Sequence, residues 1–394
     1  MDFSQELTRR RLLFDGGMGA LLASMGVRTE CPEELGYERP ELISGIHSSY
    51  KDAGANVIIT NSLGMHPVKL AKTGRAENAE KWTRQAVINA KAAGADFVAL
   101  DMGTTGEFLR PVGSLSFDEA YEGYRLVAKA GKEAGADIAL LETMTDIAEA
   151  RCACLAALSA GLPAAASFTF EKNGRTLTGG TPQCAAITLR AAGAMALGVN
   201  CSGGAQAMFA PLSAMLSVSP LPIIVQPNAG LPITDGEGNT VYPDGPEAML
   251  PHMQTILDMG ASAIGGCCGT TPDHIRAFAS LDLSVPPAPA WDGQEYICSA
   301  RAFIPAKEAL SSSVEIGEAD DLYDLEDGEC GLITLDDVDD IPAFLLEAQM
   351  ATYQPLIFKT DDMDKLACAL RLYPGAAGVV TSIPSPLPYG ALRL

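Results

Sequence analysis

Short apolar runs alternate with longer stretches of helical periodicity along the first two thirds of the chain. Eight of these runs are typical of buried strands: residues 12–14, 57–60, 97–100, 138–141, 165–170, 196–199, 223–225 and 261–264. The stretches between them predict helices over residues 41–53, 77–93, 117–134, 147–158, 185–192 and 246–259. Most end in an Ala-Gly or Met-Gly pair, which favours a helix stop with glycine in the left-handed cap position. Eight strands, each followed by a helix, predict an α/β fold with a closed (β/α)₈ TIM barrel over residues 1–284.

The pattern changes near residue 285. The run Val285-Pro286-Pro287-Ala288-Pro289-Ala290 predicts a stiff, proline-rich linker over residues 285–293. A small α/β C-terminal unit is expected over residues 294–394, with strands at 332–335, 355–358 and 377–381 and helices at 341–350 and 363–372. Residues 315–340 are dense in Asp and Glu and contain no basic residue, which is typical of a solvated face or a mobile loop. We expect this unit to pack beside the barrel.

Polar clusters follow six of the eight predicted barrel strands, at the rim where active sites of such barrels lie. A lone acid in such a place is more often a helix cap, but the joint placement favours a site. The glycine turn after the first strand lacks the full spacing of a dinucleotide fingerprint, and its amides are suited to hold a small carboxylate instead. The clusters are Asp15-Gly16-Gly17-Met18-Gly19, Asn61-Ser62, Asp101 to Gly106, Glu142-Thr143-Met144, Ser167 to Phe170 and Gln226-Pro227-Asn228-Ala229-Gly230.

Two glycine-flanked cysteine segments follow the sixth and eighth predicted strands: Asn200-Cys201-Ser202-Gly203-Gly204 and Gly265-Gly266-Cys267-Cys268-Gly269. Neighbouring side chains of a strand point to opposite faces, so Cys267 and Cys268 need a break in the pleat to meet one metal, and the glycines permit it. Zinc prefers tetrahedral coordination, and three protein ligands leave one position for substrate. The segments therefore predict a catalytic Zn²⁺ site on Cys201, Cys267 and Cys268.

Two other interpretations of these cysteines stay open at this point. Free cysteine is among the most buried residue types, so the three could simply be small core residues. A disulfide between the adjacent Cys267 and Cys268 is the second alternative. The other seven cysteines do not extend the pattern, because they are scattered and none forms a Cys-x-x-Cys pair.

Charge and composition exclude several classes of function. The formal net charge of −22 argues against nucleic-acid binding, because an acidic surface repels phosphate backbones. No apolar run is long enough to span a bilayer, so no membrane association is expected. The first residues lack the apolar core of a signal peptide, and unpaired thiols point to a reducing compartment, so a cytoplasmic protein is expected.

The cysteine segments resemble those of the homocysteine S-methyltransferases, a family that includes the homocysteine-binding barrel of cobalamin-dependent methionine synthase. The resemblance covers roughly residues 10–282. It implies that Cys201, Cys267 and Cys268 supply the zinc thiolates. It departs at Leu63, where an aromatic residue is common, and at residues 101–105, which only approximate a glycine-proline turn. It also implies that the amino-acid end of homocysteine is held by Asp15, the turn Gly16-Gly17-Met18 and Glu142, with Asn61, Ser167, Asn200 and Asn228 in the same substrate site.

The implied reaction is zinc-dependent methyl transfer to the thiol of homocysteine, which gives methionine. A separate methyl-corrinoid protein is the first choice of methyl donor. The chain is too short for added folate and cobalamin modules, and it lacks the Asp-x-His-x-x-Gly motif of a cobalamin module. No cobalamin site is therefore expected in this chain. A small methyl-sulfonium or methylammonium donor is the alternative among enzymes. A zinc- and homocysteine-binding module without turnover of its own is the alternative from another class.

The C-terminal unit has a weaker resemblance of its own. Residues 355–375 resemble a piece of the folate-binding barrel of methionine synthase. A complete folate barrel needs more residues than this tail contains, so we expect a structural appendage or a docking face for the partner.

Overall fold

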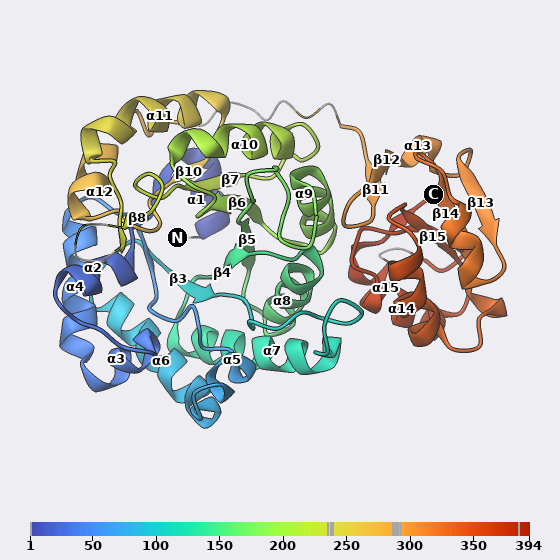
Figure 1. Ribbon diagram of the computed structural model, residues 1–394, viewed down its shortest axis with the longest axis horizontal. Coiled ribbons are helices and arrows are strands. Elements are labelled where there is room, and N and C mark those ends of the chain that lie inside the picture. Colours follow the sequence, from blue (N-terminus) through green and yellow to red (C-terminus); the bar gives the residue numbers. More distant parts are fainter. Residues whose placement is uncertain (1, 235, 237–239, 286–290, 292, 385–386) are drawn as a thin grey trace.

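The computed structural model describes residues 2–234, 236, 240–285, 291, 293–384 and 387–394. Most of the proline-rich run predicted as a linker therefore lies outside the described residues. In Figure 1, a ring of helices surrounds a central set of strands, and a smaller group of strands and helices lies to one side. No helix of the described residues is long and apolar enough to cross a membrane.

Eight parallel strands form the barrel, as the sequence predicts. Their order around the sheet is β1-β10-β7-β6-β5-β4-β3-β2, and a parallel bridge from Phe14 to Val57 joins the two ends. The bounds are β1 (Leu12–Leu13), β2 (Val57–Ile59), β3 (Phe97–Met102), β4 (Ile138–Met144), β5 (Ala164–Phe168), β6 (Ala196–Asn200), β7 (Ile223–Gln226) and β10 (Ala263–Ile264).

All six predicted barrel helices are present, as α4 (Pro40–Asp52), α6 (Ala79–Lys91), α7 (Phe117–Ala134), α8 (Ile147–Ser159), α9 (Pro182–Ala191) and α11 (Pro246–Met259). α7 shows why its bounds were readable: Ser116 and Glu119 form a capping box at its start, and Gly135 ends it with a φ of 98°. α9 begins three residues before its predicted start, because the Thr181 side chain caps it by accepting a hydrogen bond from the Cys184 amide.

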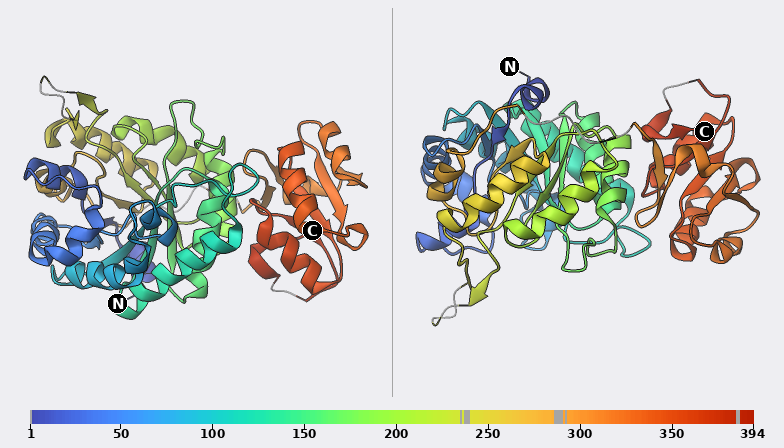
Figure 2. Two further views of the ribbon diagram at one scale, coloured as in Figure 1. Left: turned by 60° about the horizontal axis from the view of Figure 1, so that its bottom comes forward. Right: turned by 90° about the horizontal axis from the view of Figure 1, so that it is seen from above.

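Further helices were not predicted, because they are short or lack a contrast between apolar and polar faces. They are α1 (Phe3–Arg9), α2 (Met18–Ser24), α3 (Pro32–Glu38), α5 (Pro67–Ala71), α10 (Phe209–Leu216) and α12 (Pro272–Phe278), with 3₁₀ turns at Ala76–Asn78 and Ala205–Met208. A hairpin of β8 (Ile233–Thr234) and β9 (Thr240–Val241) follows β7. Figure 2 (right) places this hairpin and α1 at opposite ends of the barrel.

The barrel interior is apolar at one end and polar at the other. Phe3 and Leu7 of α1 pack with Phe14, Phe97 and other interior side chains and so fill the end at which the strands begin. Alternation along β3 then continues from Phe97 and Ala99 to Asp101, which is buried. The same step leads to Glu142 on β4, Ser167 on β5 and Gln226 on β7. A layer of polar side chains therefore lies above the apolar plug, at the rim where the strands end.

The C-terminal residues form a second parallel sheet in the simple order β13-β14-β15-β16-β17. The predicted strands and helices are found as β14 (Cys330–Thr334), β15 (Leu356–Lys359), β16 (Gly378–Val380), α14 (Ile341–Ala351) and α15 (Met363–Leu372). The edge strands β13 (Ser313–Ile316) and β17 (Leu392–Arg393), the hairpin β11 (Tyr296–Cys298) and β12 (Phe303–Pro305), α13 (Ala306–Ala309), and 3₁₀ turns at Ala319–Asp324, Leu335–Asp337 and Pro388–Gly390 were not predicted.

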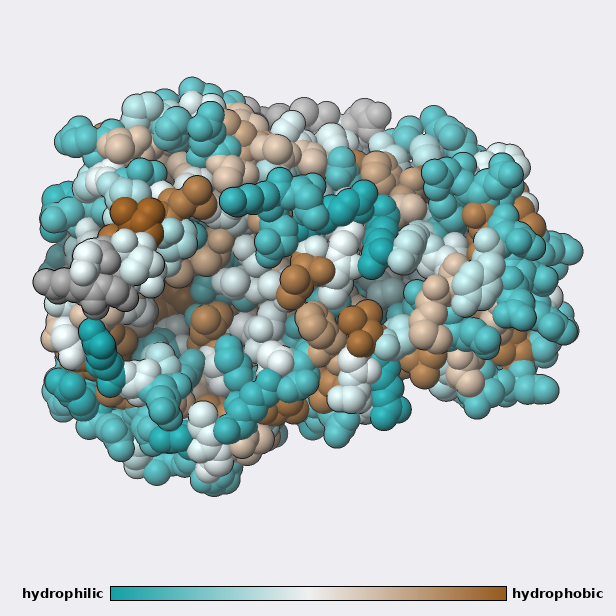
Figure 3. All heavy atoms as spheres, viewed as in Figure 1, coloured by the Kyte–Doolittle hydropathy of each residue, from teal (hydrophilic) through white to brown (hydrophobic). Residues whose placement is uncertain are grey.

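The acidic stretch over residues 315–340 is a solvated face rather than a loop without structure. It contains the end of β13, two 3₁₀ turns and the whole of β14. Its apolar residues, such as Leu322 and Ile333, are buried, whereas nearly all its carboxylates are exposed. Hydrophilic residues accordingly dominate the surface of the C-terminal unit (Figure 3).

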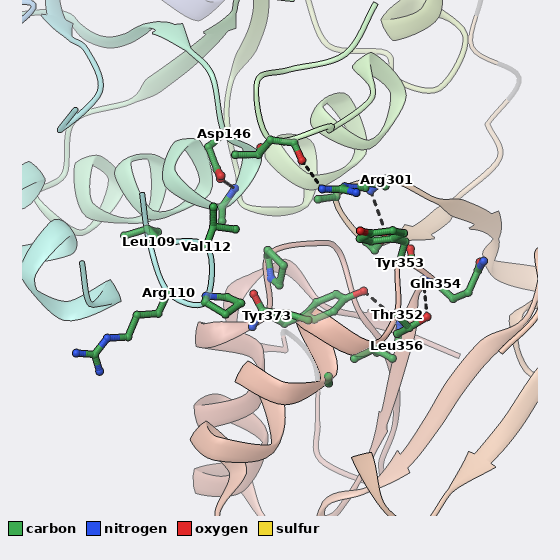
Figure 4. Close-up of a pocket in the computed structure, with 18 residues that line it drawn as sticks. Leu109, Arg110, Val112, Asp146, Arg301, Thr352, Tyr353, Gln354, Leu356 and Tyr373 are labelled. Carbon is green, nitrogen blue, oxygen red and sulfur yellow. Dashed lines mark hydrogen bonds between the residues drawn. The ribbon is translucent and has the colours of Figure 1, made fainter. Parts of the chain in front are cut away.

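The C-terminal unit packs on α7, α8 and α9, as expected. Arg151 of α8 is buried and donates hydrogen bonds to the carbonyls of Leu370 (2.5 Å) and Arg371 (3.1 Å), at the end of α15. Arg301, in the turn between β11 and β12, donates to the Thr178 carbonyl (2.7 Å) and lies 4.0 Å from the centre of the Tyr353 ring. Figure 4 shows Arg301 and Tyr353 at a cleft between the two parts, which Asp146 and Tyr373 also line.

Candidate functional site

Cys201, Cys267 and Cys268 come together at the rim. Their sulfur atoms all lie within 4.8 Å of one another, and the Sγ atoms of Cys201 and Cys268 are 3.7 Å apart. Sulfur atoms at the corners of a tetrahedron around zinc, with bonds of about 2.3 Å, are about 3.8 Å apart. All three cysteines are free thiols, so the alternative of a disulfide between Cys267 and Cys268 is wrong for this structure. The three are partly accessible, so they are not core residues either.

The backbone at both segments departs from strand geometry in the way the cysteines require. β10 ends at Ile264, so Cys267 and Cys268 lie in the following loop, where the pleat no longer separates their side chains. Cys201 has a φ of 53°, which is uncommon for a residue other than glycine. Such strained backbone clusters at functional sites, and it turns Cys201 toward the other loop here.

Two buried asparagines hold the cysteine loops. Asn228 accepts a hydrogen bond from the Cys268 amide (3.1 Å) and donates one to the Cys201 carbonyl (3.4 Å). Asn200 donates to the Cys267 sulfur (3.8 Å) and to the Thr143 hydroxyl (2.7 Å), and it accepts from the Ser167 hydroxyl (2.8 Å). The structure thus brings the predicted site residues Asn200, Asn228 and Ser167 into one network with the sulfurs.

The three thiols titrate as a group. The pKa of Cys268 falls to about 3, because Cys201 and Cys267 donate hydrogen bonds to its sulfur. The pKa of Cys267 is raised well above its ordinary value, because its thiol donates to Cys201 and Cys268 and is buried. Without a metal, the cluster therefore carries a thiolate at Cys268 and keeps protons on its neighbours. A cation that binds all three sulfurs must displace those protons.

The glycine turn after β1 packs directly against the Cys267 loop. The Gly17 amide donates to the Thr270 hydroxyl (3.1 Å), and Tyr50 donates to the carbonyls of both Gly17 (3.1 Å) and Thr270 (3.0 Å). A methyl group on Gly17 would lie 2.7 Å from the Cys267 carbonyl oxygen, so only glycine allows this approach. Gly16 and Met18, on either side, are partly accessible.

Three carboxyl groups lie at the same rim, and burial raises the pKa of each. Burial raises the pKa of Glu142 to about 7, with a further contribution from the charge of Cys268. Burial also raises the pKa of Asp15 and of Asp101 well above the ordinary value, and the charge of Glu142 adds to both. Glu142 hydrogen-bonds to Asp101, so this pair holds a proton between them near neutral pH. Such a group of carboxyls is suited to receive an ammonium group.

Asn61, unlike the other predicted site asparagines, hydrogen-bonds to a helix start rather than to the cysteine loops. Its amide nitrogen donates to the Pro32 carbonyl (2.7 Å), so it ties the end of β2 to the start of α3. No contact between Asn61 and the cysteines is found among the described residues. Its place in the substrate site stays a prediction.

Three further residues at the rim received no role from the sequence. Asp101 and Gln226 belong to the polar clusters, but only the fold shows that both are buried in the interior layer. Tyr242 follows β9, packs over Gly269 and hydrogen-bonds to Cys268. Burial and the Cys268 charge raise its pKa, so it stays a neutral donor. Tyr242 and Cys268 are 26 positions apart in the sequence, and no local sequence pattern indicates their contact.

Fold and site together define an eight-stranded α/β barrel with a cluster of three cysteines at its rim. Residues 12–281 match the homocysteine S-methyltransferase family, and the chain belongs to this family. It is 29% identical to methionine synthase of Mycobacterium leprae (strain TN) over 300 residues, which are 71% of this chain and 25% of that protein. It is also 29% identical over 306 residues to methionine synthase of Mycobacterium tuberculosis (strain ATCC 25618 / H37Rv), covering 72% of this chain and 26% of that one. The chain thus spans about a quarter of the length of these relatives.

Solved structures of the homocysteine methyltransferase MmuM from Escherichia coli are similar as well. The metallated form has a TM-score of 0.57 and 26% identity, over 71% of this chain and 98% of that one. The oxidized form has a TM-score of 0.56 and 27% identity, over 68% and 94% of the two chains. The resemblance to the homocysteine S-methyltransferase family and the TIM-barrel architecture, both expected from the sequence, are therefore confirmed.

Proposed function

We propose that this chain is a zinc-dependent enzyme that transfers a methyl group to the thiol of homocysteine and so forms methionine. The observation that carries the proposal is the group of three cysteine sulfurs within 4.8 Å of one another at the rim of the barrel. Thiolate ligands suit zinc, and the 3.7 Å separation of two sulfurs matches a tetrahedral site. The likeness to a metallated homocysteine methyltransferase supports the assignment.

Zinc held by Cys201, Cys267 and Cys268 would lower the pKa of a substrate thiol, so that the thiol reacts as its more nucleophilic thiolate. The remaining roles fall to the chain itself. Asn228 and Asn200 hold the cysteine loops through the hydrogen bonds described above. Tyr242 donates to Cys268 and so stabilises that thiolate. Asp15, Glu142 and the turn at Gly16, Gly17 and Met18 would hold the amino-acid end of homocysteine.

The proposed methyl donor is a separate methyl-corrinoid protein. The hairpin of β8 and β9 lies next to the cysteine loops, and its described residues include three exposed apolar side chains, Leu231, Ile233 and Val241. A group of exposed apolar side chains is typical of a surface that binds another protein. Such a patch suits a protein partner. The acidic C-terminal face would add a salt-dependent contribution to docking.

A small sulfonium or ammonium methyl donor is the second candidate. The observation in its favour is that MmuM, whose chain is matched over 94–98% of its length, is a homocysteine methyltransferase of barrel size. A third candidate is a zinc- and homocysteine-binding module that needs other components for turnover, since the methionine synthases that this chain resembles are about three times as long.

The test is an assay of methionine formation by the zinc-loaded protein with homocysteine and, in turn, a methylated corrinoid protein, methylcobalamin, a methyl-sulfonium compound and a quaternary ammonium compound. Turnover with the corrinoid donors alone supports the first choice, and turnover with a small donor supports the second. Homocysteine binding without turnover supports the module. Absence of homocysteine binding would contradict all three.

A further inference from the structure

Buried polar atoms without a hydrogen-bond partner are concentrated at the barrel rim. Within the described residues, such side-chain atoms occur in Asp15, Asp101, Gln226 and His47. The first three lie at the ends of β1, β3 and β7, and only His47 lies elsewhere, in α4. Buried polar groups are nearly always paired, and leaving one unpaired costs about 1–3 kcal/mol. The proton shared with Glu142 accounts for Asp101, so Asp15 and Gln226 are the two groups at this rim that lack a partner within the described residues. They indicate a partner that comes from outside the chain.

Gln226 differs from the two acids because it can donate hydrogen bonds. Its side chain is fully buried, and neither its amide nitrogen nor its amide oxygen has a partner among the described residues. Ile224 packs in the barrel interior, whereas Val225 packs against the helices, so alternation turns Gln226 inward. β7 and β3 lie opposite each other in the closed strand order, so Gln226 faces the side of the barrel that carries Asp101.

A zwitterionic amino acid bound in this layer needs donors for its carboxylate as well as acceptors for its ammonium group. Asp15, Asp101 and Glu142 supply acceptors, and the strand ends that form the layer carry no lysine or arginine. Among the described residues, the one cation that acts on the layer is Lys69 of α5, whose charge lowers the pKa of Asp101, so it lies on the side of the acids. The Gly17 amide, a candidate donor, already donates to Thr270. The Gln226 amide nitrogen is thus a buried side-chain donor whose acceptor is still missing.

We propose that Gln226 is a substrate-binding residue whose side-chain amide donates a hydrogen bond to the α-carboxylate of homocysteine, opposite the acids that receive its ammonium group. The assignment rests on the proposed function, because it requires homocysteine in the barrel. It makes Gln226 a determinant of specificity for amino-acid thiols over simple thiols, since a site built around a hydrogen-bonding group rejects ligands that leave it unpaired.

The experiment compares two ligands by calorimetric titration of the zinc-loaded protein: homocysteine and aminopropanethiol, which is homocysteine without its carboxylate. Gln226→Leu should weaken homocysteine binding about tenfold to a hundredfold, the range for a lost hydrogen bond to a charged group. It should change the affinity for aminopropanethiol less than about threefold. The variant should also melt at a higher temperature than the native protein without ligand, because it removes a buried amide that has no partner.

Two comparisons make the result specific. Gln254→Leu, at a partly exposed position of α11, should leave both affinities unchanged. Glu142→Gln should instead weaken the binding of ligands that carry an ammonium group. The affinity for homocysteine and for aminopropanethiol should fall more than the affinity for mercaptobutanoate, which is homocysteine without its ammonium group. Equal weakening of homocysteine and aminopropanethiol by Gln226→Leu, or unchanged homocysteine affinity, would overturn the assignment alone. Failure of the native protein to bind homocysteine would overturn the proposed function and this assignment with it.

Discussion

At the residue scale, the site combines sulfur ligands with carboxyl groups that are kept partly protonated by burial. Glu142 and Asp101 share a proton, and Cys268 holds the negative charge of the thiol cluster. These buried charged groups lower the folding stability of the protein without ligands, and binding of a metal and of an ammonium group compensates for this loss. At these positions the residues therefore favour binding over stability.

The cost should appear in the pH dependence of unfolding. A carboxyl group whose pKa is raised in the folded state favours folding below its unfolded pKa, and this contribution is lost as the pH rises through the folded value. Glu142, with a pKa of about 7, should therefore destabilise the metal-free protein by up to about 3 kcal/mol at pH 8 relative to pH 4. Glu142→Gln should remove this loss, so its advantage in unfolding free energy should grow between pH 5 and pH 8. A constant difference across that range, or the same pH trend for the exposed Glu38→Gln, would contradict the assignment.

At the scale of elements, the barrel strands were predictable, whereas most contacts between loops were not. Eight apolar runs and the glycine-terminated helices carry a local signal, and each was found. Gln226 gained its role only from its unpaired side chain inside the closed barrel, and Tyr242 only from its contact with the distant Cys268. The cluster of three cysteines was predictable because glycines beside cysteines indicate a loop that turns its side chains together.

The loop after β10 offers a test of that local logic. A methyl group on Gly266 would overlap with the buried Thr270 side chain, which ties this loop to the glycine turn after β1. Gly266→Ala should therefore lower zinc content by more than half and leave the barrel folded, as judged by circular dichroism. Gly45→Ala, on α4 with no atom near its new methyl group, should keep full zinc content and gain about 0.5–1 kcal/mol in stability. Equal zinc content in the two variants would count against the account.

At the scale of the whole molecule, the C-terminal unit is joined to the barrel by buried contacts. Cys298 and Ala376 pack into the main apolar cluster of the barrel, and Arg151 reaches the end of α15. The sequence predicted two units but not this interface, because its donors and acceptors are more than 100 positions apart. The division of the chain at residues 284 and 294, and the likeness of the tail to a folate barrel, stay predictions.

The buried arginine is the most direct probe of this interface. Arg151→Met would leave the two carbonyl groups at the end of α15 without their donor, so the free energy of unfolding should fall by about 1–3 kcal/mol. Arg125→Met breaks only an exposed ion pair with Glu122 and should change it by less than about 1 kcal/mol. Denaturant titrations of the two variants measure the difference, and equal losses would mean that Arg151 adds nothing to the interface.

The central claim is that zinc sits on three cysteine sulfurs and takes the homocysteine sulfur as its fourth ligand. X-ray absorption at the zinc edge counts sulfur neighbours directly. The account predicts three sulfurs at about 2.3 Å and one lighter ligand in the zinc-loaded protein, and four sulfurs when homocysteine is added. A count that stays at three with saturating homocysteine, or fewer than three sulfurs in the protein alone, would contradict it.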